Sequence, residues 1–341
     1  MRGGPVAEGE AIVPIIGSLR RLVLAPSLEK VSFAGRGFPV SPSEATERLE
    51  AIPQAVVCGF EWGIDPRSQW ELERRLALVD AEQRGFAYEG ATMACAVLDA
   101  MAPRGGHRTR DLLLGPGRPH IFLAYIGIGF AMARLPRVLW RKVAPDLPRD
   151  GGYYPEMSWL AVDGYGFDLA YFDTERWIDR QERPAAYAWE GDAGYFPRAV
   201  DQGIGRALWF VRGGNPGDVA AAVRAFAAER HADLWAGVGL AATFAGGTGD
   251  AGYATLRHEA GDHRTELAQG SVFAVKARHH SGFVPGHTGD AVGRLAGLDV
   301  ERAVRLADDT AVTGASGGSA PAYERWRQNV QEGLEKARAA D

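Results

Sequence analysis

The feature that most constrains this chain is a pair of small residues, G-x-x-x-A, that recurs six times at nearly even intervals. The steps between successive glycines are 37, 39, 37, 34 and 33 residues. Each pair lies inside an apolar run, and six pairs in register are not expected by chance even in a chain with 44 glycines. We interpret the pattern as an internal repeat. The pairs are Gly90 with Ala94, Gly127 with Ala131, Gly166 with Ala170, Gly203 with Ala207, Gly237 with Ala241, and Gly270 with Ala274.

Small residues at this spacing favour helices that pack closely. Residues i and i+4 lie on one helix face, so glycine and alanine there let a neighbouring helix approach. A glycine inside a helix costs up to about 1 kcal/mol relative to alanine, and packing has to offset that cost. The sequence therefore predicts an all-α fold of about six helix-pair repeats, an α-solenoid similar to tetratricopeptide arrays. Six unrelated buried helices in an irregular bundle are the alternative.

The repeats divide the chain into three parts. Residues 1–40 are expected to form an N-terminal extension or cap, 41–310 the helical-repeat domain, and 311–341 a flexible linker with a C-terminal helix. Capping residues predict a helix over 43–50, and apolar periodicity predicts others over 67–80 and 288–308. The segment 323–339 is interpreted as a detached helix that caps the array or contacts a partner.

Composition and charge exclude several classes of protein. The net charge is −5 without a long run of like charge, so a nucleic-acid partner is not indicated. The longest apolar run, 121–133, is shorter than the roughly 20 residues that cross a bilayer, and no export signal is recognised at the N-terminus. Cys58 and Cys95 do not match a zinc-site spacing. We expect a soluble cytoplasmic protein.

Strong catalytic signatures are not found in the sequence. The segments GIG and GVG resemble a fragment of a dinucleotide-binding motif, but they lie inside predicted helices rather than at a strand-to-helix turn. Polar residues beside the repeat glycines are the better candidates, since they would line one concave surface. Capping or hydrogen bonding between repeats is the alternative role. The candidate catalytic residues of this kind are Glu89, Asp201, Gln202 and Arg206. Lys276, two turns after Gln269, is a further candidate, since burial would lower its pKa and suit amine chemistry; a solvated or ion-paired lysine is the alternative.

Aromatic side chains are frequent on the same predicted helices. Most are expected to anchor the core, but those that face a groove would suit a flat apolar ligand. The candidate ligand-binding residues are Tyr88, Tyr125, Trp209, Trp235 and Gln269. His120, His231 and His263 precede repeat glycines by six or seven residues and are expected to mark helix starts. The spacing of the remaining histidines fits no metal template, so no metal site is predicted, and no cofactor is identified.

The chain resembles a known family over about residues 20–310. The segments that carry the resemblance are GFAYEGATMACAVLDAM, GPGRPHIFLAYIGIGFAMARLPR, LAVDGYGFDLAYF, DQGIGRALWFV, ADLWAGVGLAATFAGG and LAQGSVFAVKARHH, in that order. They are similar to the UnbL-like proteins, domains of unknown function associated with the warhead cassette of bacterial enediyne biosynthesis. The resemblance implies a cytoplasmic role in maturing a linear polyene, made by an iterative polyketide synthase, into an enediyne core. It supplies no catalytic residues.

The functional hypothesis is an enzyme or accessory protein that binds a conjugated, apolar polyene and promotes its conversion. A non-enzymatic helical-repeat scaffold for other biosynthetic proteins is one alternative, and a protein that sequesters a reactive product is another. A binding protein predicts polar residues that converge on an aromatic-lined cavity, whereas a scaffold predicts an open groove.

Overall fold

A computed structural model describes residues 27–66, 68–103, 105–148, 156–312 and 320–340. Throughout this part of the chain the regular structure is helical and no β-strand is formed, which confirms the predicted all-α class. In the same residues, no helix combines the length and the apolar character that a membrane span requires.

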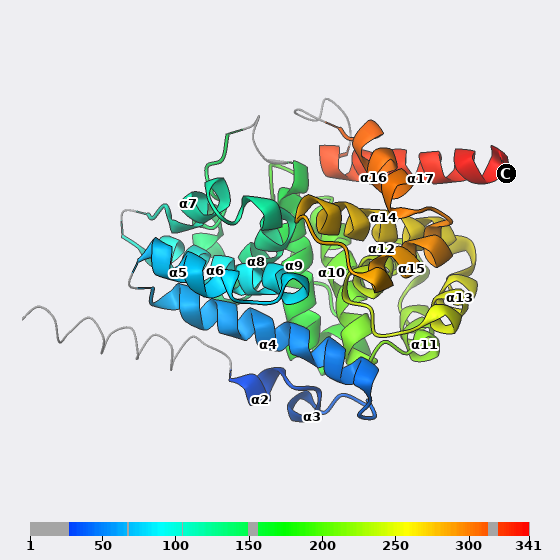
Figure 1. Ribbon diagram of the computed structural model, residues 1–341, viewed down its shortest axis with the longest axis horizontal. Coiled ribbons are helices and arrows are strands. Elements are labelled where there is room, and N and C mark those ends of the chain that lie inside the picture. Colours follow the sequence, from blue (N-terminus) through cyan, green and yellow to red (C-terminus); the bar gives the residue numbers. More distant parts are fainter. Residues whose placement is uncertain (1–26, 67, 104, 149–155, 313–319, 341) are drawn as a thin grey trace, which may run out of the picture.

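Seven long helices form the centre of the molecule (Figure 1), and six of them carry the repeat. Each contacts the next in chain order. They are α4 (Glu44–Ile64), α6 (Ala81–Met101), α8 (Ile121–Arg134), α9 (Trp159–Phe172), α10 (Phe196–Val211), α12 (His231–Ala245) and α14 (Arg264–His280). His120 and His263 are the N-cap residues of α8 and α14, and His231 begins α12, as predicted.

The remaining elements lie outside this array. The α-helices are α2 (Leu28–Val31), α3 (Phe33–Arg36), α5 (Gln69–Ala77), α7 (Arg108–Leu114), α11 (Pro216–Ala225), α13 (Asp250–Glu259), α15 (Gly286–Ala296), α16 (Val300–Asp309) and α17 (Ala322–Ala340). Short turns of 3-10 helix are η1 (Arg118–His120), η2 (Arg137–Lys142), η3 (Glu156–Ser158), η5 (Ala228–Arg230) and η6 (Gly261–His263), and η4 (Glu175–Asp179) is a π-helix.

The repeat glycines bring neighbouring helices into backbone contact. At Gly203 of α10, a Cβ atom would overlap the carbonyl oxygen of Asp163 on α9. At Gly237 of α12, it would overlap the carbonyl oxygen of Gln202 on α10. Gly90, Gly127 and Gly270 meet the preceding helix of the array in the same way. The cost of each mid-helix glycine is thus offset by a contact that no other residue permits.

A second glycine, two residues further on, contacts the following helix. Gly205 approaches the carbonyl oxygen of Leu234 on α12, and Gly239 that of Leu267 on α14. Two residues turn a helix by about 200°, so the glycines of a G-x-G segment lie on opposite faces. The GIG and GVG segments are therefore two-sided packing motifs, and their similarity to a nucleotide-binding motif is coincidental.

The array curves until its first and last repeat helices meet. Arg278 of α14 donates a hydrogen bond to the carbonyl oxygen of Glu82 on α6, at 2.8 Å. The rings of Phe86 on α6 and Phe244 on α12 are in edge-to-face contact, with centroids 5.4 Å apart. The long helices consequently surround a central space rather than an exposed concave face. The tetratricopeptide-like pairing of helices remains a prediction.

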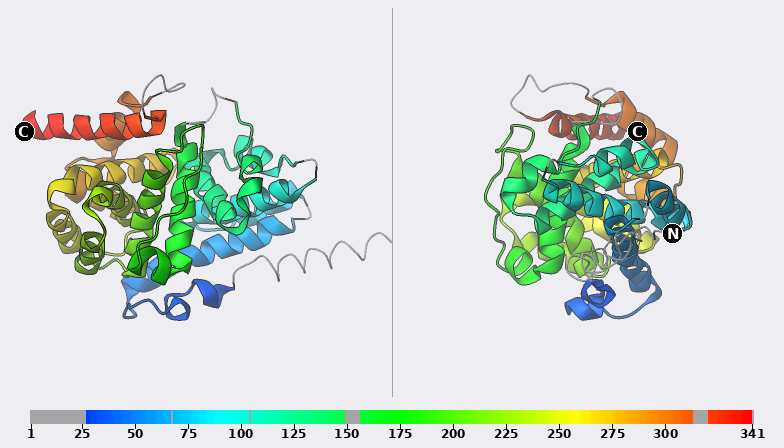
Figure 2. Two further views of the ribbon diagram at one scale, coloured as in Figure 1. Left: turned by 180° about the vertical axis from the view of Figure 1, so that it is seen from behind. Right: turned by 90° about the vertical axis from the view of Figure 1, so that its left-hand side faces the viewer.

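The outer helices cover this array. Helices α11, α13 and α15 contact one another in succession along one side (Figure 1). In both views of Figure 2, α17 lies at the opposite edge of the molecule from α2 and α3. It packs on α14 and α16.

Several predicted boundaries are corrected. The helix expected over 43–50 continues to Ile64, because Pro53 is accommodated inside α4. The segment 288–308 forms two helices, since Gly297 adopts a left-handed conformation at the end of α15. The C-terminal helix is not detached: Tyr323, Trp326 and Arg327 on it are each 2% exposed. Most of the predicted N-terminal cap and linker lies outside the described residues.

We predict opposite effects for alanine at two helical glycines. Gly237→Ala forces a Cβ against the backbone of α10 and is expected to lower the free energy of unfolding by about 1–3 kcal/mol. Gly293→Ala, on the exposed side of α15 with open space around it, is expected to raise it by about 0.5–1 kcal/mol. Urea denaturation of both variants checks this. Equal effects would contradict the packing role of the repeat glycine.

Candidate functional site

The centre of the helical array contains a narrow apolar cavity, here called the first cavity. About 640 Å³ of atom-free space, open solvent included, lies among its lining residues, and about 40 Å³ of it admits the centre of a water molecule. Every repeat helix contributes to the lining. Most lining side chains are aromatic or aliphatic, and Glu89, Arg206 and Lys276 are the charged ones. The aromatic side chains are Phe86, Phe122, Phe210, Phe244, Phe273 and Trp326.

A second cavity adjoins the first on the side of α4 and α9. About 610 Å³ of atom-free space, open solvent included, lies among its lining residues, and about 60 Å³ of it admits the centre of a water molecule. The two cavities share four lining residues, Phe86 and Glu89 from α6, and Arg206 and Phe210 from α10. We call these four residues the waist. Phe86 and Glu89 are three residues apart and Arg206 and Phe210 four residues apart, so the two residues of each helix lie on the same helix face.

Glu89 is the most unusual group at the waist. Its side chain lies among apolar neighbours and is 2% exposed. Within the described residues, its carboxyl group has no hydrogen-bond partner. Burial raises the pKa of Glu89 to about 8, since the charged form loses its hydration, although the positive charge of Arg206 opposes this shift. A pKa of about 8 favours the protonated form of Glu89 at neutral pH, and the residue lines both cavities.

The positive charge of Arg206 is balanced by the carboxylate of Asp163. Its Nη1 atom forms a buried ion pair with Asp163 of α9, and its guanidinium lies 5.1 Å from the centroid of the Phe167 ring. Both members of the ion pair are less than 10% exposed. A buried pair of this kind needs both partners, because one alone would leave an uncompensated charge.

Each cavity has one further charged lining residue or pair outside the waist, and these groups form two more ion pairs. In the first cavity, Lys276 Nζ lies 2.5 Å from Asp308 of α16. In the second, Arg134 Nη1 lies 2.6 Å from Asp168, and burial raises the pKa of Asp168 to about 6 despite that pairing. The charged groups that line the two cavities, Glu89 excepted, are thus in ion pairs.

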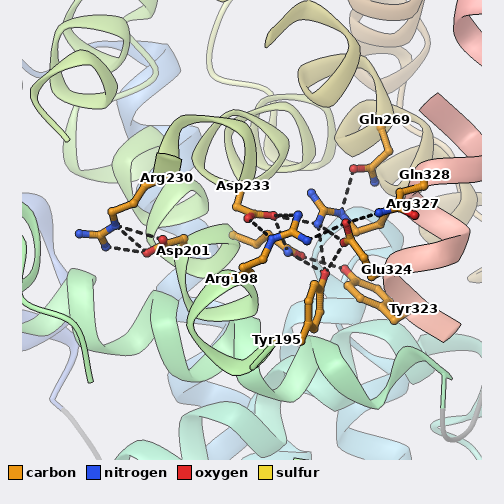
Figure 3. Close-up of polar contacts among 11 residues, drawn as sticks. Tyr195, Arg198, Asp201, Arg230, Asp233, Gln269, Tyr323, Glu324, Arg327 and Gln328 are labelled. Atoms are coloured by element: carbon orange, nitrogen blue, oxygen red, sulfur yellow. Dashed lines mark hydrogen bonds and ion pairs between the residues drawn. The ribbon is translucent and has the colours of Figure 1, made fainter. Parts of the chain in front are cut away.

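A buried polar network lies beside the first cavity and fixes α17 in place (Figure 3). Its centre is Arg327, whose Nη1 donates to Asp233 of α12 at 2.8 Å, Glu324 at 2.7 Å and the Tyr195 hydroxyl at 3.0 Å. Its Nε donates to Gln269 of α14 at 3.1 Å.

The charges within this network balance. Arg198 joins it by pairing with Asp233 at 2.8 Å and Glu324 at 2.9 Å, so two cations meet two carboxylates. Burial favours the neutral form of Asp233, but Arg327 and Arg198 outweigh it and hold its pKa below the usual range. Such an arrangement is typical of a structural network.

The structure separates the predicted catalytic residues into three places. Glu89, Arg206 and Lys276 line the first cavity. Gln202 belongs to the α17 network, where it donates to Asp233 and to the Tyr195 hydroxyl, both at 3.0 Å. Asp201 forms a separate buried ion pair with Arg230, 2.5 Å from its Nη2 (Figure 3). Their assignment as catalytic residues remains a prediction.

The predicted ligand-binding residues lie outside both cavity linings. Trp209 donates to the carbonyl oxygen of Gly246 at 2.8 Å, and Tyr88 stacks on His120 in a small core cluster between α5, α6 and α7. Tyr125 and Trp235 are buried in the main core, and Gln269 accepts the bond from Arg327. Within the described residues no group of three or more potential metal ligands is present.

Two kinds of residue were missed by sequence reasoning. Asp163 and Asp233 stand inside apolar runs, and a carboxylate in such a place needs a buried cation. The sequence therefore indicates that each of these carboxylates has a buried cationic partner, but it does not show which arginine or lysine that partner is. Arg327 is one of many arginines on a polar helix, and only the packing of α17 distinguishes it.

Comparison with known proteins identifies one family. The family model described as "Protein of unknown function (DUF1702)" matches residues 15–334. No curated protein and no solved structure gives a significant match.

We predict that Glu89 makes stability fall as pH rises. Its pKa is near 4.3 in an unfolded chain and about 8 in the folded protein, so between these values the unfolded state loses the proton that the native state keeps. The free energy of unfolding then decreases by about 1.4 kcal/mol per pH unit over this interval. Glu89→Gln should abolish this contribution, so its melting temperature rises relative to wild type from pH 5 to pH 8.

The exposed Glu335→Gln variant on α17 is the control, and its melting temperature is expected to follow wild type at each pH. A Glu89→Gln variant with the same pH dependence as wild type would refute a neutral Glu89.

We also predict that α17 depends on Arg327. Arg327→Ala leaves the buried carboxylates of Asp233 and Glu324 with one shared cation, Arg198, instead of two, which is expected to cost about 3–5 kcal/mol. Lys336→Ala, on the exposed part of the same helix, is expected to change stability little. Urea denaturation measures both, and similar values for the two variants would argue against the network.

Proposed function

The chain belongs to the DUF1702 family of unknown function, and we propose that it binds a slim, apolar, conjugated polyene inside its ring of helices. The observation that carries this proposal is the pair of adjoining apolar cavities that share Glu89, a buried carboxyl group with no hydrogen-bond partner among the described residues. Narrow spaces lined by aromatic side chains favour a slim, flat ligand, and a few polar groups then set its orientation.

We further propose that this polyene is an intermediate in enediyne-type polyketide biosynthesis. The proposal rests on the resemblance of the repeat segments to UnbL-like proteins, together with the apolar interior. In this role the protein works in the cytoplasm, as an enzyme or as an accessory protein that holds the polyene for a partner. Turnover of the bound polyene by the isolated protein distinguishes the two.

The protonated state of Glu89 suits proton transfer or hydrogen bonding to a ligand. A general acid or base is most effective when its pKa lies near the working pH, and Glu89 meets this condition. The N–H groups of Arg206 that Asp163 does not use would add a second hydrogen-bond donor for a polar group of the ligand.

Binding can be tested with diphenylhexatriene, a neutral conjugated probe that fluoresces in apolar surroundings. Ala277→Phe places a ring in the first cavity and is expected to weaken binding at least about tenfold, or 1.4 kcal/mol. Ala254→Phe, on the exposed side of α13, is the matched control and should leave binding unchanged. Equal affinities of the two variants would overturn the proposed cavity binding.

The biosynthetic role needs a separate experiment. Deletion of the gene in its host, followed by mass spectrometry, is expected to show polyenes accumulating at the expense of the mature product. An unchanged metabolite profile would remove the biosynthetic proposal, whatever the probe measurements give.

A further inference from the structure

The waist between the two cavities has features of a recognition site for part of a ligand. Glu89 and Arg206 both line the first and the second cavity, and both are less than 10% exposed. They come from α6 and α10, which are not consecutive in the array. A ligand group at the waist would therefore meet polar side chains from two directions, while the ligand on either side of it met apolar walls.

Both polar side chains of the waist can donate hydrogen bonds. A protonated carboxyl group donates through its O–H, and a guanidinium only donates. The Glu89 carboxyl group has no partner among the described residues. Arg206 uses Nη1 for Asp163, and within the same residues its Nε and Nη2 make no hydrogen bond. An acceptor oxygen between these two side chains has two lone pairs, enough to accept one hydrogen bond from each.

Charge balance at the waist excludes an anionic ligand group. Arg206 is paired with Asp163, so with protonated Glu89 the three groups carry no net charge. The ion pairs Lys276 with Asp308 and Arg134 with Asp168 are likewise neutral. A carboxylate placed here would be an uncompensated charge in an apolar interior, which is costly.

We infer that the two cavities form one binding site for a linear, uncharged ligand whose mid-chain carbonyl oxygen accepts hydrogen bonds from Glu89 and Arg206 at the waist. One apolar arm of the ligand then occupies each cavity. The inference rests on the proposed function, which it deepens by naming the polar group of the ligand and its position along the chain.

The position of the carbonyl group is tested by displacement of diphenylhexatriene. Three competitors of equal length are used: dioctyl ketone, heptadecane and heptadecanoate. Dioctyl ketone should bind about tenfold more tightly than heptadecane, because its oxygen accepts hydrogen bonds from a charged donor and a neutral donor. Heptadecanoate should bind more weakly than the ketone. Equal affinity of ketone and alkane, or tighter binding of the carboxylate, would overturn the inference.

The donor role of Glu89 is tested by two substitutions of similar size. Glu89→Gln keeps an N–H donor and should preserve the preference for dioctyl ketone. Glu89→Leu removes the donor and should reduce that preference severalfold, while diphenylhexatriene still binds. Infrared spectra give a second readout, since the carbonyl band of the bound ketone should shift to higher frequency in Glu89→Leu only. An unchanged preference in Glu89→Leu contradicts the assignment.

Use of both cavities is tested by filling each in turn. Ala277→Phe fills the first cavity and Val56→Phe the second, and each should weaken dioctyl ketone binding at least about tenfold. The milder Ala277→Leu and Val56→Leu variants, checked by their melting curves, replace any variant that does not fold.

The outcomes separate this inference from the proposed function. Weaker binding in the Ala277 variants alone would overturn the two-cavity site and leave the proposed function in place. If neither substitution affects diphenylhexatriene or the ketone, both proposals fail.

Discussion

The contact on which the structure depends is the approach of one helix backbone to the next at a repeat glycine. At Gly166, Gly203 and Gly237, the neighbouring carbonyl oxygen occupies the place where any other residue would have its Cβ atom. The second glycine of each G-x-G segment repeats the contact on the opposite helix face, so that one short segment joins three helices. Interiors are close-packed, and small residues are what allow helices to cross at this separation.

Closely spaced helices leave a narrow, largely apolar interior, and this limits which charged side chains it can hold. Charged groups in such a place have to be paired, as Arg206 with Asp163 and Arg134 with Asp168 are. Among the described residues Glu89 has no such partner, and its raised pKa favours the protonated form. This carboxyl group lines both cavities, which is why the proposals on ligand binding centre on it.

The C-terminal helix completes the interior from a distant part of the chain. Trp326 contributes to the lining of the first cavity, and the neighbouring Arg327 links α12 and α14 to α17. The balanced charges around Arg327 account for two polar residues beside repeat glycines, Gln202 and Gln269, as members of one network. Polar residues next to repeat glycines are thus buried, but that position does not distinguish a cavity residue from a network residue.

The sequence by itself determined the helices of the repeat and the small-residue faces through which they pack, because 3.6-residue periodicity and glycine spacing are local properties. It also placed Glu89 and Arg206 among the candidates. Only the tertiary structure decided that the array closes on itself, that α17 packs against it, and that Glu89 and Arg206 meet at one waist while Tyr88 and Trp209 lie elsewhere. Which side chains meet depends on the curvature accumulated over many helix contacts, and no single segment of the chain encodes that curvature.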